Sequence, residues 1–198
     1  QENTVVKKRS FGNDSAKVAA LSQKVLDGLH EENVYGVIKH FPGHGATAGD
    51  THEGYAYTDK SLEELEQQEL VPFQNAIENH IAIIMAGHIS VPNVTGDNTP
   101  SSLSKIMITD VLREKMGFDG IVITDALNMG AISQHYSSAE VSVKVLEAGG
   151  DMLLMPENFQ EAYQGILEAV QNGTLTEERI DESVRRILKV KEKLTAED

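Results

Sequence analysis

Short apolar runs rich in β-branched residues alternate along this chain with longer amphipathic stretches. The apolar runs are Val34–Ile38, Ile81–Met85, Ile121–Thr124 and Met152–Met155, with a weaker one at Thr4–Val6. Helical spacing of apolar residues predicts helices over Asp14–His30, Ser61–Asn79, Ser104–Met116, Asn158–Gln171 and Thr176–Leu194. Almost wholly apolar strands that alternate with helices are typical of βα units around a buried parallel sheet. The pattern therefore predicts an α/β fold.

Ionisable side chains stand at the ends of three of these predicted strands. Lys39 and His40 follow the first run, His88 follows the second, and Asp125 follows the third. The carboxyl ends of parallel strands meet at one rim, where such folds bind ligands and place their catalytic groups. The sequence therefore predicts one site on that rim.

The loop that begins at Lys39, KHFPGHGATAGDTH, is dense in glycine and ionisable groups. In an extended segment, Asp50 and His52 point the same way, so the carboxylate can orient the imidazole and raise its basicity. Such a pair suits general acid/base catalysis, although a bare Asp-x-His also occurs in ordinary polar loops. His44, between two glycines, either faces a ligand or holds the loop by a backbone hydrogen bond.

Three residues at the strand ends have both a functional and a structural interpretation. Asp125 suits a nucleophile or a stabiliser of a developing cation, and alternatively it caps the segment that follows. Lys39 and His40 suit a hydroxyl-rich ligand, and alternatively they form a salt bridge and a satisfied core histidine.

A zinc site is the competing interpretation of the histidine-rich loop. His40, His44, Asp50 and His52 are a plausible ligand set by residue type. A strand-borne histidine and a long glycine loop lack the rigidity of two histidines one helical turn apart, and no second acidic ligand is near. We therefore expect neither a metal nor another cofactor.

Composition narrows the function classes. The formal net charge of −14 disfavours nucleic acid as a partner, because a phosphate binder needs a basic face. No apolar run approaches transmembrane length, and the absence of cysteine excludes disulfides and thiolate ligands. The compartment stays open between the cytoplasm and the cell envelope or secretion.

Several separated motifs together resemble those of glycoside hydrolase family 3, in its bacterial β-N-acetylhexosaminidase branch. They are KHFPGHG, DTH, GFDGIVITDALNM and AGGDMLLMP, and the resemblance extends from Arg9 to about Leu194. It implies a (β/α)8 barrel and a retaining hydrolase that releases terminal β-linked N-acetylglucosamine from cell-wall fragments or chitooligosaccharides. The natural substrate and its aglycone stay open.

The resemblance also implies roles for individual residues. Asp125 matches the family's nucleophile, and Asp50 with His52 matches the Asp-His pair that serves as general acid/base. The family's sugar-holding residues match Arg9, Lys39 and His40. Ala46 departs from the pattern, because relatives commonly carry an acidic or amide residue there.

The number of βα units matches only part of the family's barrel. Four or five units are about half of eight, and the relatives' first three strands, with a sugar-binding aspartate, have no counterpart. We expect residues 1–198 to form a single domain that corresponds to about strands four to eight. Either a homo-oligomer or a separate N-terminal half would then cover the sheet, or the chain closes differently, as an open doubly wound sheet. Open alternatives are phosphorolysis, a metal-dependent hydrolase, and an inactive or sugar-binding fragment.

Overall fold

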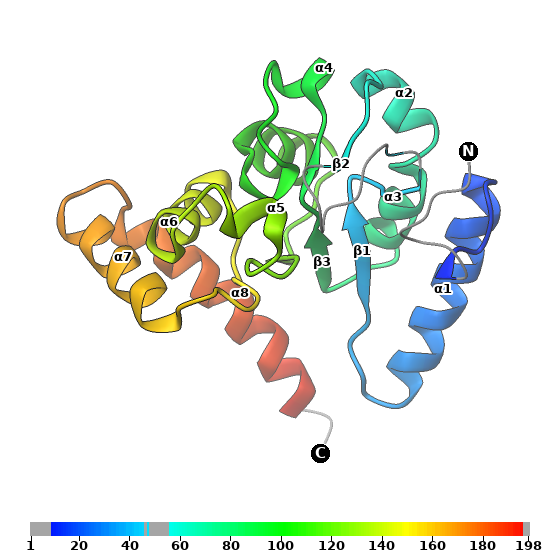
Figure 1. The fold of residues 1–198 in the computed structure, drawn as a ribbon. Helices are drawn as coiled ribbons and strands as arrows, with labels where there is room; N and C mark the ends of the chain where they lie inside the picture. Colours follow the sequence, from blue (N-terminus) through cyan, green and yellow to red (C-terminus); the bar gives the residue numbers. More distant parts are fainter. Residues whose placement is uncertain (1–8, 46, 48–55, 196–198) are drawn as a thin grey trace.

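A parallel three-stranded sheet forms the centre of the molecule (Figure 1). The structure is a computed structural model that describes residues 9–45, 47 and 56–195, with side chains up to residue 192. The strands are β1 (Val37–Phe41), β3 (Ile83–Ala86) and β5 (Ile121–Thr124), in the order β1-β3-β5. Since all neighbours are parallel, the carboxyl ends of the three strands lie on one side.

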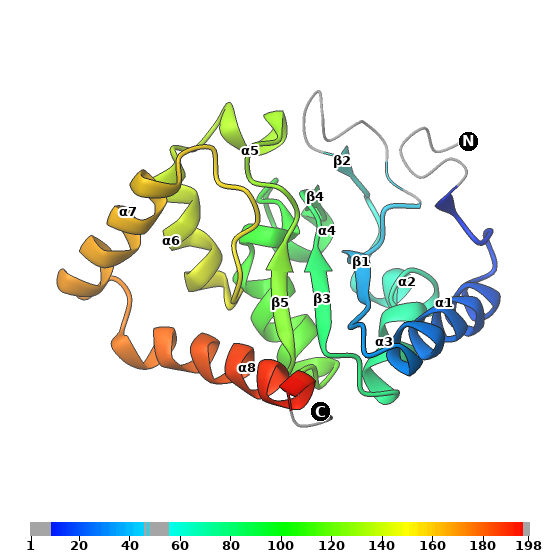
Figure 2. The same ribbon diagram turned by 90° about the horizontal axis from the view of Figure 1, so that it is seen from below.

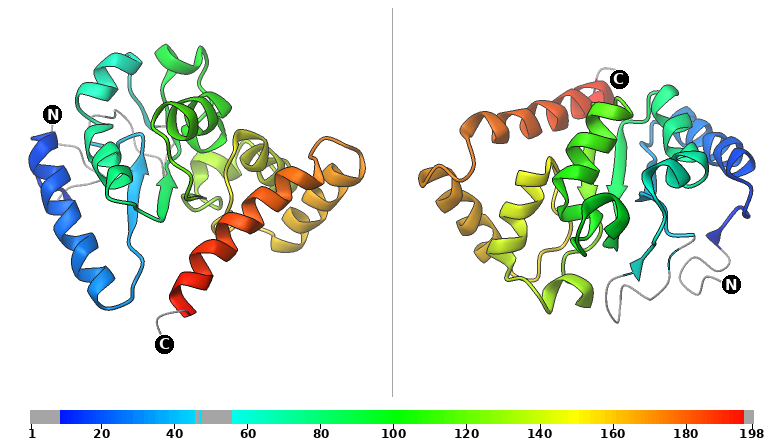
Figure 3. Two further views of the ribbon diagram at one scale, coloured as in Figure 1. Left: turned by 180° about the vertical axis from the view of Figure 1, so that it is seen from behind. Right: turned by 90° about the horizontal axis from the view of Figure 1, so that it is seen from above.

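A second, two-stranded parallel sheet lies beyond the carboxyl ends of the first (Figure 2). It pairs β2 (Ala56–Tyr57) with β4 (Ile89–Ser90). The helices are α1 (Ser15–Glu31), α2 (Leu62–Gln67), α3 (Val71–Glu78), α4 (Pro92–Thr95), a 3-10 helix (Ser101–Leu103), a π-helix (Ile106–Lys115), α5 (Gly130–Ser133), α6 (Ser138–Ala148), α7 (Phe159–Gln171) and α8 (Glu177–Thr195). Helix α1 lies at one end of the molecule and the α6–α7 pair at the other (Figure 3).

One face of the central sheet is buried under helices. Ile84 and Val122 are in register on this face and pack with Met107, Ile108 and Leu112 of the π-helix. The opposite face is covered less completely, because Val37 at its edge is 39% exposed. The described strands form parallel sheets with β1 and β5 at the edges of the central one, and the expected α/β fold with parallel strands is confirmed.

The expected single helix Ser61–Asn79 was wrong, because two helices occupy this segment. Ser61 and Glu64 form the capping box that begins α2, with Ser61 Oγ accepting from Glu64 N at 3.3 Å. Pro72 then lies in the first turn of α3. Proline lacks an N–H and clashes with the preceding turn, so a continuous helix could not pass through it.

Two of the expected strands differ from those observed. The strand expected at Val34–Ile38 starts later, as β1, so Lys39 and His40 lie within it and do not follow it. Met152 makes only an isolated parallel bridge with Ile123, so the strand expected at Met152–Met155 was wrong for the described chain. The expected strand at Thr4–Val6 lies outside the described residues.

Helix α6 was not expected from the sequence. It begins at a capping box formed by Ser137 and Glu140, and it ends at Gly149, whose φ of 102° is left-handed. A side chain at that φ would be strained, which explains glycine there. Among the described helices, none is both long enough and apolar enough to cross a bilayer.

Candidate active site

Asp125 stands at the carboxyl end of the central strand layer, immediately after β5. Its backbone N donates to the carbonyl of Ala86 at 2.8 Å, which continues the pairing with β3 for one residue. Its Oδ1 accepts from the N–H of Ala126 at 2.9 Å. The side chain keeps 20% of its surface exposed, so the carboxylate is anchored and still accessible.

His40 of β1 faces the second oxygen of this carboxylate. Its Nε2 lies 3.6 Å from Asp125 Oδ2, and its side chain is 11% exposed. Burial lowers the pKa of His40 to about 4, and the positive charges of Lys39 and Arg9 act in the same direction, while Asp125 opposes them. At neutral pH the imidazole is therefore uncharged, and the contact is a dipole beside a carboxylate and not an ion pair.

The space for this contact comes from Gly87, which follows β3 between the two outer strands. A Cβ at Gly87 would lie 3.0 Å from the Cβ of His40. A larger residue at position 87 would therefore displace the His40 side chain from its contact with Asp125.

His44 packs edge-on against His40 and closes its own loop. The two ring centroids are 5.7 Å apart at an interplanar angle of 78°. Thr47 Oγ1 donates to the carbonyl of His44 at 2.9 Å, so its only proton is used and His44 Nδ1–H donates to that hydroxyl at 2.8 Å. The His44 ring thus holds its loop through the hydroxyl of Thr47.

The structure brings together only some of the residues expected at the site. His40 and Asp125 meet at the carboxyl ends of β1 and β5, and Lys39 precedes His40 with an exposed side chain. Arg9 is exposed and close enough to influence the charge of His40. Asp50 and His52 lie outside the described residues, so the acid/base pair and half of the zinc set are not placed. Within the described residues, no cluster of three or more histidine or carboxylate side chains could hold a metal ion.

His88 was expected on the same rim but without a catalytic or binding role, and the structure places it just after β3. It is fully buried, and its ring bridges Ser102 and the carbonyl of Ala126, the residue after Asp125. Its position just after an apolar run was the signal that placed it on the rim.

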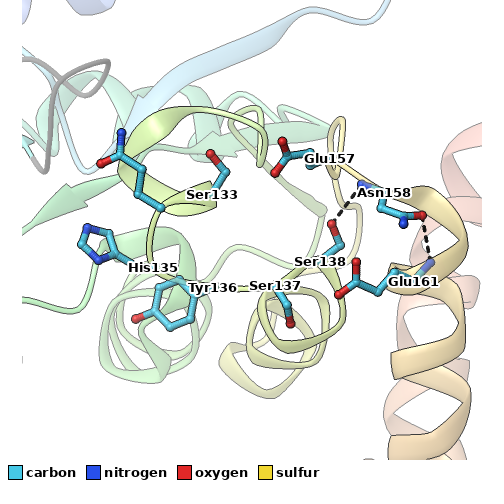
Figure 4. A pocket seen from close by; sticks show the side chains of 9 residues that line it. Ser133, His135, Tyr136, Ser137, Ser138, Glu157, Asn158 and Glu161 are labelled. Atoms are coloured by element: carbon cyan, nitrogen blue, oxygen red, sulfur yellow. Dashed lines mark hydrogen bonds between the residues drawn. The ribbon is translucent and has the colours of Figure 1, made fainter.

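A separate open hollow of about 570 Å³ lies between α5 and the first turns of α6 and α7 (Figure 4). Its lining is polar and includes His135, Tyr136, Glu157 and Glu161. None of the residues expected at the site lines it.

Comparison with known proteins decides the family. The profile described as "Glycosyl hydrolase family 3 N terminal domain" matches residues 1–190. The chain belongs to glycoside hydrolase family 3. The resemblance inferred from its motifs is confirmed.

Relatives of this family 3 chain are β-hexosaminidases and related enzymes. A solved β-N-acetylglucosaminidase from Paenibacillus sp. is 37% identical with a TM-score of 0.95, and it aligns with 99% of this chain and 38% of its own. The β-hexosaminidase LpqI of Mycobacterium tuberculosis is 35% identical, and it aligns with 96% of this chain and 50% of its own. The structure of a β-glucoside phosphorylase, BglX, is 31% identical with a TM-score of 0.90, and it aligns with 95% of this chain and 35% of its own. This family 3 chain thus spans half or less of these relatives.

Proposed function

We propose that this family 3 domain is the part of a retaining glycosidase that carries the nucleophile, and that the enzyme releases terminal β-linked N-acetylglucosamine. The observation that carries the proposal is the carboxylate of Asp125, with Oδ1 held by the Ala126 N–H at 2.9 Å and Oδ2 facing His40 at 3.6 Å. A nucleophile needs one oxygen presented in a fixed direction, and this arrangement supplies it.

In the proposed reaction Asp125 Oδ2 attacks the anomeric carbon of the terminal sugar. The glycosidic C–O bond breaks, and the leaving oxygen takes a proton from the imidazole of His52, which Asp50 orients. His52 then removes a proton from water, which attacks the same carbon and releases Asp125. Configuration is retained because two displacements occur at one centre.

His40, Lys39 and Arg9 hold the sugar in this proposal. A neutral His40 can donate or accept a hydrogen bond, which suits a sugar hydroxyl beside the nucleophile. Lys39 is exposed, so its ammonium can reach a hydroxyl without first losing a buried partner.

Residues 1–198 form one domain in this proposal, corresponding to about strands four to eight of the barrel. The domain covers 38% of the Paenibacillus enzyme and 50% of LpqI, so the proposed enzyme includes more than this segment. Either a separate N-terminal half or a second copy would cover the remaining face of the sheet.

Phosphorolysis is the second candidate, favoured by the likeness to a β-glucoside phosphorylase. A neutral imidazole as acid/base repels incoming phosphate less than a carboxylate would. Product analysis with and without inorganic phosphate separates the two reactions, because phosphorolysis yields a sugar phosphate and hydrolysis yields the free sugar.

Turnover of a chromogenic β-N-acetylglucosaminide tests the proposal. We expect Asp125→Asn to lose at least about 10³-fold in kcat, because the amide is not a competent nucleophile. Asp110→Asn, at an exposed position of the π-helix, is the matched control and should retain turnover. If the enzyme that contains this domain binds N-acetylglucosamine but does not turn over the glycoside, the domain serves sugar binding alone. An active Asp125→Asn enzyme would overturn the assignment of the nucleophile.

A further inference from the structure

His88 is a fully buried histidine that the proposed reaction does not use. It lies between β3 and β4, with 0% of its surface exposed. A buried imidazole needs partners for both ring nitrogens, since an unsatisfied polar atom in the interior is costly. Both nitrogens have such partners.

The two hydrogen bonds define the proton position on the ring. Nε2 lies 3.0 Å from the carbonyl oxygen of Ala126, which can only accept, so Nε2 carries a proton. Nδ1 lies 2.8 Å from Ser102 Oγ. Burial lowers the pKa of His88, so the ring is neutral at physiological pH and Ser102 donates its hydroxyl proton to Nδ1.

Ala126 is the residue whose position decides how the Asp125 carboxylate is held. The Ala126 N–H binds Asp125 Oδ1 at 2.9 Å, and the Ala126 carbonyl receives the His88 Nε2–H. Backbone bonds hold the residues on either side, from Asp125 N to Ala86 O and from Leu127 N to Leu154 O, each at 2.8 Å. The Ala126 carbonyl also accepts from Met129 N at 3.2 Å, a bond within its own turn. Among the described side chains, that of His88, which follows β3, ties this carbonyl to the neighbouring strand.

We propose that His88, oriented by Ser102, is a positioning residue that fixes the turn at Ala126 and thereby aims Asp125 Oδ2 at the sugar. The effect on catalysis rests on the proposed function, whereas the effect on the turn does not. If His88 lost its bond to Ala126, the Ala126 N–H that donates to Asp125 Oδ1 would shift. The carboxylate would rotate with it, and Asp125 Oδ2 would point in another direction.

Two substitutions of His88 distinguish the effect of its bond to Ala126 from the effect of having any polar side chain at this position. His88→Gln places an amide N–H near the position of Nε2 and can still reach the carbonyl. His88→Asn places its amide near Nδ1, keeps a partner in Ser102, and falls short of Ala126. Ser102→Ala keeps the ring and its bond to Ala126 but removes the hydroxyl that donates to Nδ1. His80→Asn, at an exposed position with a φ of 62° that asparagine tolerates, is the control.

The activity measurement uses activated and unactivated glycosides. Since a misplaced nucleophile slows attack whatever the leaving group, we expect His88→Asn to lose about 10- to 100-fold in kcat on both, with KM changed less than about threefold. His88→Gln should recover at least about tenfold of that loss, and Ser102→Ala should fall between them. Equal activities of the Gln and Asn variants, or a loss confined to KM, would overturn the inference.

Amide hydrogen exchange gives a readout that does not depend on turnover. We expect faster exchange at Asp125 and Leu127 in His88→Asn than in His88→Gln, with amides of α1 unchanged in both. If the enzyme that contains this domain shows no turnover, the proposed function fails, and a difference in exchange would still support the role of His88 at the turn. Equal exchange in the two variants would overturn that role even in an active enzyme.

Discussion

The imidazole of His40 and the carboxylate of Asp125 meet at 3.6 Å although His40 lies in β1 and Asp125 follows β5, the two outer strands of the central sheet. β3 runs between them, and the contact passes over Gly87 just beyond its end, where a Cβ would lie 3.0 Å from that of His40. Three successive βα units therefore build one contact: two supply the groups and the third leaves room for them.

Acid should destabilise the fold through His40. Burial lowers its folded-state pKa from 6.5 to about 4, so between these values the unfolded chain takes up a proton that the folded chain does not. Stability from this residue is complete above about pH 6.5, falls as the pH drops toward 4, and changes no further below that. We expect the free energy of unfolding to fall by an amount on the order of 3 kcal/mol between pH 6.5 and 4, as measured by urea unfolding at each pH.

The variant His40→Gln isolates this effect from the titration of carboxylates. It should unfold with a flatter dependence on pH between about 4 and 6.5 than the wild type. His30→Gln changes an exposed histidine at the end of α1 and should follow the wild-type curve. Parallel curves for wild type and His40→Gln would contradict the assigned burial of the ring.

How far the sequence predicts the fold depends on whether local or distant contacts decide each element. β5 was predicted at its observed bounds, because its apolar run is itself flanked by Gly120 and Asp125. β1 was predicted too early, since the first residues of the apolar run close helix α1: Val34 N bonds Leu29 O at 2.9 Å. Gly36 then packs against Leu26, a contact that spacing along the chain does not reveal.

The candidate site likewise combines features that the sequence predicts with features set by distant contacts. The strand-end pattern brought His40 and Asp125 to one rim, although His40 proved to lie inside β1. The bonds of His88 could not be predicted, because Ser102 is 14 residues away and Ala126 is 38 residues away. Helix α6 has a local signal, its Ser137–Glu140 capping box, which apolar periodicity alone does not reveal.

Asp151 should be the most sensitive structural carboxylate in the described chain. Its side chain is fully buried and accepts from Arg113 Nη2 at 2.6 Å, Ser183 Oγ at 2.7 Å and Val122 N at 2.9 Å. Arg186 Nη1 adds a contact at 3.2 Å, so α8, the π-helix and β5 meet on one carboxylate. Asp151→Asn leaves buried arginine charge uncompensated and should lower the free energy of unfolding by about 3 kcal/mol.

The matched control for Asp151→Asn is Asp181→Asn on the same helix as Arg186. Asp181 pairs with Arg185 at 3.3 Å, but both side chains are more than half exposed. Solvent screens such a pair, so the change in unfolding free energy should stay below about 1 kcal/mol. Urea denaturation of both variants checks the contrast, and equal losses would contradict it.

Two glycines in helices should respond in opposite directions to alanine. At Gly165 in α7, a Cβ would lie 2.6 Å from the Cβ of Ala139 in α6, so Gly165→Ala should force the two helices apart and cost about 1–3 kcal/mol. At Gly28 in α1, a Cβ would meet nothing within 4 Å, so Gly28→Ala should stabilise by about 0.5–1 kcal/mol. Thermal unfolding of the two variants tests the pair, and a stabilised Gly165→Ala would refute the close helix contact.

The acid role proposed for His52 predicts a dependence on the leaving group. An activated aryl leaving group departs with little protonation, whereas a sugar leaving group needs a proton in the transition state. His52→Ala should therefore lose about 10²- to 10⁴-fold in kcat on a chitooligosaccharide and far less on an activated aryl glycoside. Asp125→Asn should lose turnover of both substrates. A His52→Ala variant that loses equally on both substrates would show that His52 does not act as the acid, and the general acid would then have to be sought elsewhere on the rim.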